Sequence, residues 1–254
     1  MVNEIGAAND PATPALDSPA SDHDAGKIAL TVWLMHGLGA IEGKVEGMAQ
    51  KQARAGRSYH HGDLRRALLE AAEAELAEKG PEGFTLRSCA KRAGVSHAAP
   101  AHHFTDMAGL LSALAAEGFE RFLAEMSRRV SISEASPQQR LTAAGLGYVA
   151  FARANPALFR LMFSSNRPDH GQPPLADAAT AAFDHLIATV AAIEGPVPLE
   201  SAAGRRQAAK VWALAHGIAD LLISGRLNFL ARQGEEQLQQ DLEAIFSGIY
   251  RNGG

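Results

Sequence analysis

From residue 63 onward, apolar residues recur three or four positions apart, and this spacing limits the possible folds more than any other feature. No segment alternates apolar and polar residues as a half-buried strand does, and aromatic residues make up only 6% of the chain. The pattern therefore predicts an all-α protein. The first amphipathic helix is expected over residues 63–79, with an apolar face of Leu64, Ala67, Leu68, Ala71, Ala72 and Leu76.

Capping and stop signals divide the rest of the chain into further helices. Thr85 is a good N-cap for a second helix, and Asp106 for a long helix that carries Phe119, Phe122 and Met126. Gly80-Pro81 and Asn155-Pro156 each end a helix. The other helices are expected at about 97–103, 138–154, 157–163, 175–193, 200–228 and 235–250.

The first 50 residues have a different character. Residues 1–26 are rich in Ala, Pro, Asp and Ser and lack apolar periodicity, so we expect them to be disordered. Residues 27–50 are ambiguous, because glycines interrupt the apolar run that begins at Ile28. Either residues 1–50 are a disordered extension, or the native protein starts at Met48 and the upstream part is not native. A basic arm follows at 51–61.

Composition excludes several classes of protein. The single cysteine, Cys89, cannot form an internal disulfide or a zinc cluster, and this indicates a reducing, cytoplasmic compartment. We expect no metal and no cofactor. The longest apolar run, residues 28–41, is shorter than a membrane-spanning helix. No Gly-x-Ser-x-Gly motif follows a strand, so we do not expect an enzyme.

The stretch from Thr85 to Phe104 has the spacing of a helix-turn-helix. The small residue Ala90 lets two helices approach closely, and Gly94 permits a sharp turn because glycine adopts positive φ at little cost. Val95 would fill the angle between the helices, and Ser96 would start a second helix whose first residues can enter a major groove. Three basic residues and no acidic residue lie between Thr85 and Thr105.

These residues identify a family resemblance. Residues 59–122 resemble the DNA-binding domain of the TetR (tetracycline-repressor) family of transcriptional regulators, through Gly83-Phe84-Thr85-Leu86, Ala90, Ala93-Gly94-Val95-Ser96, His103-Phe104, Asp106 and Leu110-Leu111. The resemblance implies a helix-turn-helix domain at 51–105 and a helical ligand-binding and dimerisation domain at 106–254. It also implies phosphate contacts from Thr85, Ser96 and His103. Base edges would face His97, Ala98, Ala99 and His102.

Two positions depart from the family pattern. The family usually has a phosphate-contacting tyrosine where this chain has Ala101, and a lysine where it has Met107. Their loss should weaken backbone anchoring, and the basic arm could compensate for it. A second hypothesis therefore stays open, in which the protein is a helical ligand-binding or interaction protein whose headpiece no longer binds DNA.

The C-terminal half carries a weaker resemblance. Residues 159–163 and the run from Trp212 to Gly217 resemble a TetR subgroup that is marked by a Trp and His-Gly signature. From it we expect the helix with Trp212 and His216 to line a ligand pocket or the dimer interface. Residues 138–193 are expected to enclose a mostly apolar cavity with Phe151, Phe159, Met162 and Phe163 as adaptable walls and His185 or His216 as a polar anchor. For Trp212, His216 and these Phe and Met side chains, packing in the core remains the alternative.

The sequence thus predicts a DNA-binding regulator, a repressor that a small apolar or amphipathic effector releases from a near-palindromic operator. The family forms homodimers through its last two long helices. Here those helices carry two apolar stripes, which exceed what one small domain needs: Val211, Leu214, Ile218 and Leu222, and Leu238, Leu242, Ile245 and Ile249. We therefore expect a homodimer.

Overall fold

The computed structural model describes residues 61–80, 83, 85–132 and 136–250, and within them every regular element is a helix. The all-α prediction is therefore confirmed. The expectations for residues 1–50 and for the basic arm up to residue 60 lie outside the described residues. The elements are α2 (His61–Lys79), α3 (Leu86–Arg92), η1 (Ala99–His102), α4 (Met107–Ile132), α5 (Pro137–Ala154), α6 (Pro156–Ser164), α7 (Pro173–Glu194), α8 (Ala202–Ile223), α9 (Asn228–Ala231), α10 (Glu235–Ser247) and η2 (Gly248–Tyr250).

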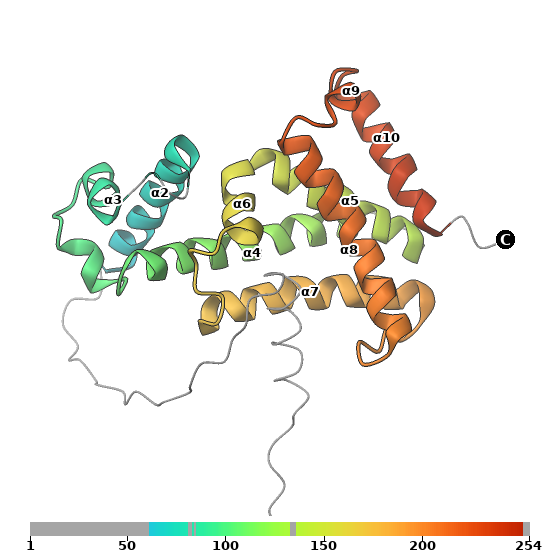
Figure 1. The fold of residues 1–254 in the computed structure, drawn as a ribbon, viewed down its shortest axis with the longest axis horizontal. Helices are drawn as coiled ribbons and strands as arrows, with labels where there is room; N and C mark the ends of the chain where they lie inside the picture. The colour runs from blue at the N-terminus through green and yellow to red at the C-terminus, as the bar shows by residue number, and fades with distance from the viewer. Residues whose placement is uncertain (1–60, 81–82, 84, 133–135, 251–254) are drawn as a thin grey trace, which may run out of the picture.

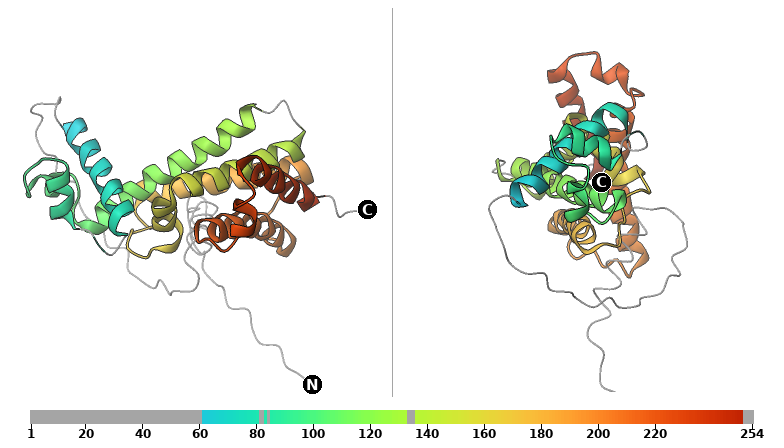
Figure 2. Two further views of the ribbon diagram at one scale, coloured as in Figure 1. Left: turned by 90° about the horizontal axis from the view of Figure 1, so that it is seen from above. Right: turned by 90° about the vertical axis from the view of Figure 1, so that its left-hand side faces the viewer.

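The long helix α4 joins the two parts of the molecule. Its first turns lie beside the headpiece, formed by α2, α3 and η1, and its remaining turns run into the body, formed by α5 to α10 (Figure 1). Figure 2 shows the headpiece at one end of the body. In the body, α4 packs against α5, α6 and α7. Any movement of α4 therefore affects both parts.

The ends of the helices follow from local chemistry. Ser136 and Gln139 form a capping box at the start of α5, because each side chain accepts a hydrogen bond from the backbone N–H of the other. The predicted helix 200–228 is shorter than expected. It ends at Ile223, because Gly225 has a φ of +75° and turns the chain.

The core of the body is built around aromatic rings. Phe122 of α4 is 3% exposed. Its ring lies edge-on to Tyr148 at 4.7 Å and to Phe151 at 5.3 Å, measured between ring centroids. Phe163 of α6 lies 5.8 Å from it. These contacts join α4, α5 and α6 in one cluster.

Among the described helices, α7 is the one whose length and composition would allow it to cross a membrane. In the fold it packs along α4, and its Leu175, Ala179 and Ala182 are buried in the core of the body. The apolar residues on this face of α7 are therefore explained by contacts within the subunit.

The apolar stripes on α8 and α10 are also largely explained by packing within the subunit. Val211, Ile218, Leu238 and Leu242 are each at most 7% exposed, so these four side chains do not exceed what one domain needs, whereas Ile245 of the same stripes is exposed. Both helices pack against α5 within the same subunit. The large apolar side chains that remain exposed in this region are Leu221, Phe229 and Ile245.

Candidate functional site

The turn between α3 and η1 has the geometry of a helix-turn-helix. Gly94 has a φ of +69°, and the N–H of Val95 donates to the carbonyl of Ala90 at 3.0 Å. The N–H of Gly94 donates to the carbonyl of Lys91, which completes a Schellman motif at the end of α3. Ala90 is fully buried and Val95 packs against the core, as the sequence predicted.

Thr85 fixes the start of α3. Its hydroxyl oxygen accepts a hydrogen bond from the backbone N–H of Ser88 at 3.1 Å, and the Ser88 hydroxyl accepts one from the N–H of Thr85 at 3.0 Å. The Ser88 hydroxyl in turn donates to the Thr85 carbonyl. Thr85 is exposed, and its own hydroxyl proton can still be donated to a phosphate.

The segment that follows the turn differs from the prediction. The expected helix 97–103 is a short 3-10 helix, η1, and Ser96 does not cap it, since its N-cap is Ala98 and no side chain caps it. Pro100 explains the difference. Pro100 would be the fourth residue of a helix that begins at His97, and proline lacks the N–H that this position donates. A proline also disfavours helical geometry at the residue before it, here Ala99.

Exposure separates the proposed DNA contacts. Five of the residues that were expected to contact DNA are exposed: Thr85, Ser96, His97, Ala98 and His102. Ala99 is only 7% exposed and packs into the headpiece, so it does not present its side chain to a base. His103 is half-buried against the ring of Phe104. Exposure therefore favours His97 and His102 over His103.

One of the three basic residues near the turn is engaged within the headpiece. Arg92 donates to Glu75 at 2.7 Å and to Glu78 at 2.5 Å, and Lys79 also donates to Glu75. These ion pairs join α3 to α2. The exposed cations left in α3 are Arg87 and Lys91, so the positive charge available to DNA is smaller than the sequence indicated.

The Glu75 cluster gives the headpiece a pH-dependent contribution to stability. Hydrogen bonds from Lys79 and then Arg92 lower the pKa of Glu75 to about 2. A lowered carboxylate pKa stabilises the fold above the pKa of the unfolded state, and this contribution is lost as the pH falls from about 4.5 toward 2. We expect Glu75→Gln to be less stable than the wild type at pH 7, with a smaller difference at pH 3.

Urea unfolding at pH 7, 4.5 and 3 measures this difference. Glu78→Gln is the matched control, because Glu78 is more exposed and pairs with Arg92 without contacting Lys79, so its effect should be smaller. An equal loss of stability for Glu75→Gln at pH 7 and pH 3 would contradict the assignment.

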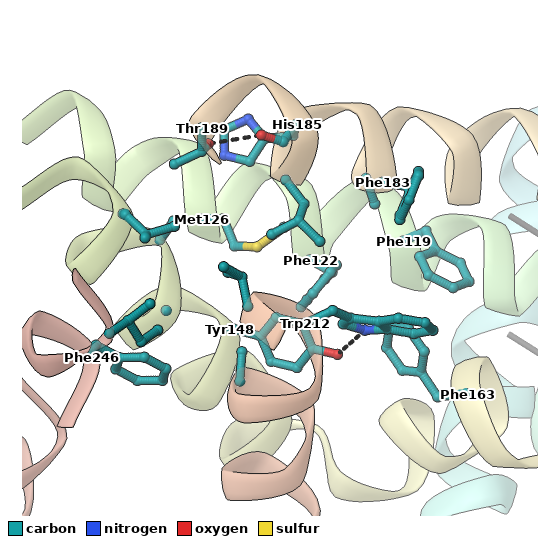
Figure 3. A pocket seen from close by; sticks show the side chains of 18 residues that line it. Phe119, Phe122, Met126, Tyr148, Phe163, Phe183, His185, Thr189, Trp212 and Phe246 are labelled. Atoms are coloured by element: carbon teal, nitrogen blue, oxygen red, sulfur yellow. Dashed lines mark hydrogen bonds between the residues drawn. The ribbon is translucent and has the colours of Figure 1, made fainter. Parts of the chain in front are cut away.

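The body contains an apolar cavity beside α4 (Figure 3). Its volume is about 50 Å³. Residues of α4, α5, α6, α7, α8, α10 and η2 surround it: Phe119, Phe122, Met126, Leu141, Ala144, Gly145, Tyr148, Phe163, Ala182, Phe183, His185, Leu186, Thr189, Val211, Trp212, Ala215, Phe246 and Ile249. None of these side chains carries a permanent charge, so the cavity suits an apolar occupant.

A chain of hydrogen bonds lies at one wall of the cavity. The indole N–H of Trp212 donates to the Tyr148 oxygen at 3.3 Å, as Figure 3 shows, and that oxygen lies 2.9 Å from Nδ1 of His216. The indole can only donate, so the Tyr148 oxygen accepts from Trp212, and the tautomer of His216 decides which of Tyr148 and His216 donates in the second bond. Burial lowers the pKa of His216, which favours the neutral ring.

The structure brings together only part of the predicted ligand site. Phe163, His185 and Trp212 line the cavity, whereas Phe151, Phe159 and Met162 lie in the core outside its lining. His216 contacts the cavity through Tyr148 rather than directly. Sequence reasoning missed the α4 wall, and on α5 it named Phe151 instead of the residues that line the cavity, Leu141, Ala144, Gly145 and Tyr148. The small residues of α5, Ala144 and Gly145, are the signal that could have indicated a space beside them.

A polar link connects the cavity region to the headpiece. On α4, Arg121 lies between two cavity residues, Phe119 and Phe122. Its guanidinium donates to both carboxylate oxygens of Glu73 on α2, at 2.8 and 2.9 Å, and to Asn155 between α5 and α6 at 2.6 Å. The headpiece is thus tied to the stretch of α4 that forms the cavity wall.

Two family models match this chain. The model described as bacterial regulatory proteins of the tetR family matches residues 68–114. The model described as the tetracyclin repressor-like C-terminal domain matches residues 141–245. These ranges contain most of the headpiece and most of the cavity lining. A search of the curated proteins found none that matches.

Solved structures show the same architecture. A protein of unknown function from Rhodococcus sp. RHA1 is 34% identical, with 77% of this chain and 98% of that one covered and a TM-score of 0.63. A putative tetR family transcription regulator from Shewanella sp. PV-4 is 20% identical, with 73% and 96% covered and a TM-score of 0.56. The regulator FadR from Bacillus subtilis, in complex with stearoyl-CoA, is 14% identical, with 73% and 99% covered and a TM-score of 0.50.

The two family matches follow each other in the order of the fold, the first on the headpiece and the second on the body. Both agree with the geometry described above, a helix-turn-helix followed by a larger helical domain. The sequence resemblance that was based on Thr85 to Phe104 is therefore confirmed at the level of the family. The chain belongs to the TetR family of bacterial transcriptional regulators.

Proposed function

We propose that this regulator is a repressor, and that a small apolar or amphipathic molecule in the cavity releases it from a near-palindromic operator. The observation that carries the proposal is the position of the cavity on α4. Phe119 and Phe122 form its wall, and Arg121 between them holds the headpiece through Glu73. A ligand can weaken DNA binding only if it binds the DNA-free shape more tightly.

The small volume of the cavity supports a change of shape on binding. An occupant larger than about 50 Å³ must move side chains of the wall, and one that displaces the buried rings of Phe119 or Phe122 would press on α4. Arg121 would carry that movement to Glu73, and thus to α2. The spacing of two headpieces in a dimer would then no longer match two major grooves.

We further propose that the protein acts as a cytoplasmic homodimer, is not an enzyme, and divides into a headpiece at 51–105 and a body at 106–254. The exposed apolar side chains Leu221 and Ile245, on the helices that the family pairs, support the dimer. The contacts among Trp212, His216 and Tyr148 support membership of the subgroup with the Trp and His-Gly signature.

Operator binding tests the proposal, and the departures at Ala101 and Met107 give the sharpest variant. We expect the wild type to bind DNA from upstream of its own gene, with an affinity that falls as salt rises. The combined change Ala101→Tyr and Met107→Lys should raise the affinity by roughly tenfold and steepen the slope of log K against log salt by about 1, because it adds phosphate contacts. Gel shifts at several salt concentrations measure both quantities.

A matched control adds the same charge far from the headpiece. Gln138→Lys lies on the exposed side of the first turn of α5, outside the helices that the family pairs, and should leave the salt slope unchanged. If the wild type fails to bind the upstream DNA at every salt concentration tested, the second hypothesis is favoured. The protein would then be a helical ligand-binding or interaction protein whose headpiece has lost its DNA contacts, as the two departures suggested.

A further inference from the structure

We propose that the cavity takes an uncharged molecule with an apolar body and a single hydrogen-bonding group, and that His185 binds this group. The inference rests on the proposed function of the cavity as a ligand site, and it deepens that function by naming the chemical class. Three features of the lining support the inference: it has no charged side chain, its other polar side chains already form hydrogen bonds, and the buried Nε2 atom of His185 does not.

Four of the lining side chains have polar atoms, and three of these are already engaged. The Tyr148 hydroxyl lies between Trp212 and His216, and the Trp212 N–H is donated to it. The Thr189 hydroxyl donates to the backbone carbonyl of His185 at 2.7 Å, which Figure 3 shows on the α7 wall. These bonds hold the wall in place and leave little hydrogen-bonding capacity for a ligand.

His185 differs from the other three. Its Nε2 atom is buried and has no hydrogen-bond partner among the residues that the structure describes. Buried polar atoms in native proteins nearly always have a partner, and an unpaired one costs free energy. A ligand group that bonds to this nitrogen would remove the cost, whereas a hydrocarbon of the same shape would leave it.

The charge state of the site excludes an anionic ligand. Burial lowers the pKa of His185, so the ring is neutral near pH 7. No lysine or arginine lines the cavity. A carboxylate there would lose its hydration without gaining a cation, which is strongly unfavourable. A hydroxyl or a carbonyl can bond to a neutral imidazole in one of its tautomers.

The size of the cavity selects the probes. An apolar cavity of about 150 Å³ holds benzene, so the cavity here, at about 50 Å³, must expand even for one ring. Met126 and Leu186 are flexible side chains of the lining that can yield. We therefore choose three single-ring compounds that differ at one position: ethylbenzene, 4-ethylphenol and 4-ethylbenzoate.

The experiment measures the dissociation constants of the three probes by calorimetry, for the wild type and for His185→Phe, with no DNA present. We expect the preference for 4-ethylphenol over ethylbenzene to be about tenfold greater in the wild type than in His185→Phe, the effect of one hydrogen bond. When the ratio of the two dissociation constants is compared between the wild type and His185→Phe, the cost of removing the phenol from water cancels. We expect 4-ethylbenzoate to bind the wild type at least tenfold more weakly than 4-ethylphenol.

Two further variants guard against loss of folding. His185→Gln keeps a hydrogen-bonding group and should retain most of the preference. His170→Phe changes a buried histidine outside the cavity lining and should leave it unchanged. The inference is overturned if the ratio is the same in the wild type and His185→Phe, if the benzoate binds most tightly, or if no probe binds.

A second measurement separates this inference from the proposed function. The same probes are added to the protein bound to DNA from upstream of its gene. If the ratio depends on His185 as expected but no probe weakens DNA binding, the ligand class stands and the release mechanism fails. If 4-ethylphenol releases the DNA equally from the wild type and His185→Phe, the release mechanism stands and the role of His185 fails.

Discussion

Phe122→Ala is expected to lower the free energy of unfolding by about 3–5 kcal/mol, the usual cost of truncating a buried phenylalanine. Phe122 is 3% exposed, and its ring contacts Tyr148, Phe151 and Phe163 at the point where α4, α5 and α6 meet. These neighbouring rings belong to two helices, α5 and α6, which both pack against α4, so they cannot close the space left by the ring. Chemical denaturation of the purified protein measures the change.

A surface phenylalanine provides the control. Phe229 is 65% exposed, and Phe229→Ala should change the stability by less than about 0.5 kcal/mol. Because Phe122 lines the cavity, its removal should also enlarge a space that is already apolar. Benzene should therefore raise the midpoint of unfolding of Phe122→Ala more than that of the wild type. Equal losses of stability in the two alanine variants would refute the central position of Phe122.

Gly147→Ala is expected to destabilise the protein by about 1–2 kcal/mol, although alanine is the better helix former. A Cβ atom at Gly147 would lie 2.9 Å from the Cα of Met126 and 3.2 Å from the backbone oxygen of Glu125. Both contacts are with the backbone of α4, which no side-chain rotation can relieve. The two helices must move apart, and this separation outweighs the gain of up to about 1 kcal/mol in helix propensity.

The same substitution at a different helical glycine isolates this effect. At Gly109, in the first turn of α4, a Cβ would meet only the Asp106 side chain, at an ordinary distance of 3.6 Å. Gly109→Ala should therefore be neutral or slightly stabilising. Thermal unfolding of the two variants side by side tests the difference, and a stable Gly147→Ala would show that α4 and α5 can separate without cost.

The helices could be predicted from the sequence because their signals are local. The apolar period, the cap at Thr85 and the stop at Asn155-Pro156 each act within a few residues, and each matched the structure. The turn at Gly94 was predictable for the same reason. The error at 97–103 was also local, since Pro100 lies within the segment that we assigned to a regular helix.

The cavity was only partly predictable because its walls come from distant segments. The bond between Tyr148 and His216 joins residues 68 positions apart, and nothing near either residue indicates it. Phe119 and Phe122 have the same spacing as core residues, and on α4 they are core and cavity wall at once. Periodicity tells which face of a helix is apolar, but the identity of the facing helix follows only from the assembled fold.

The shortness of η1 limits how much base sequence one subunit can read. Four residues in a 3-10 helix extend about 8 Å, which is the rise of only two or three base pairs. Of these four residues, Ala99 is buried, and Ala101 carries only a methyl group, which can distinguish little beyond the methyl of thymine. Each half of an operator would therefore be short and permissive. Discrimination among genomic sites would then rest on the distance between the two halves, because the spacing of the two headpieces in the proposed dimer selects that distance.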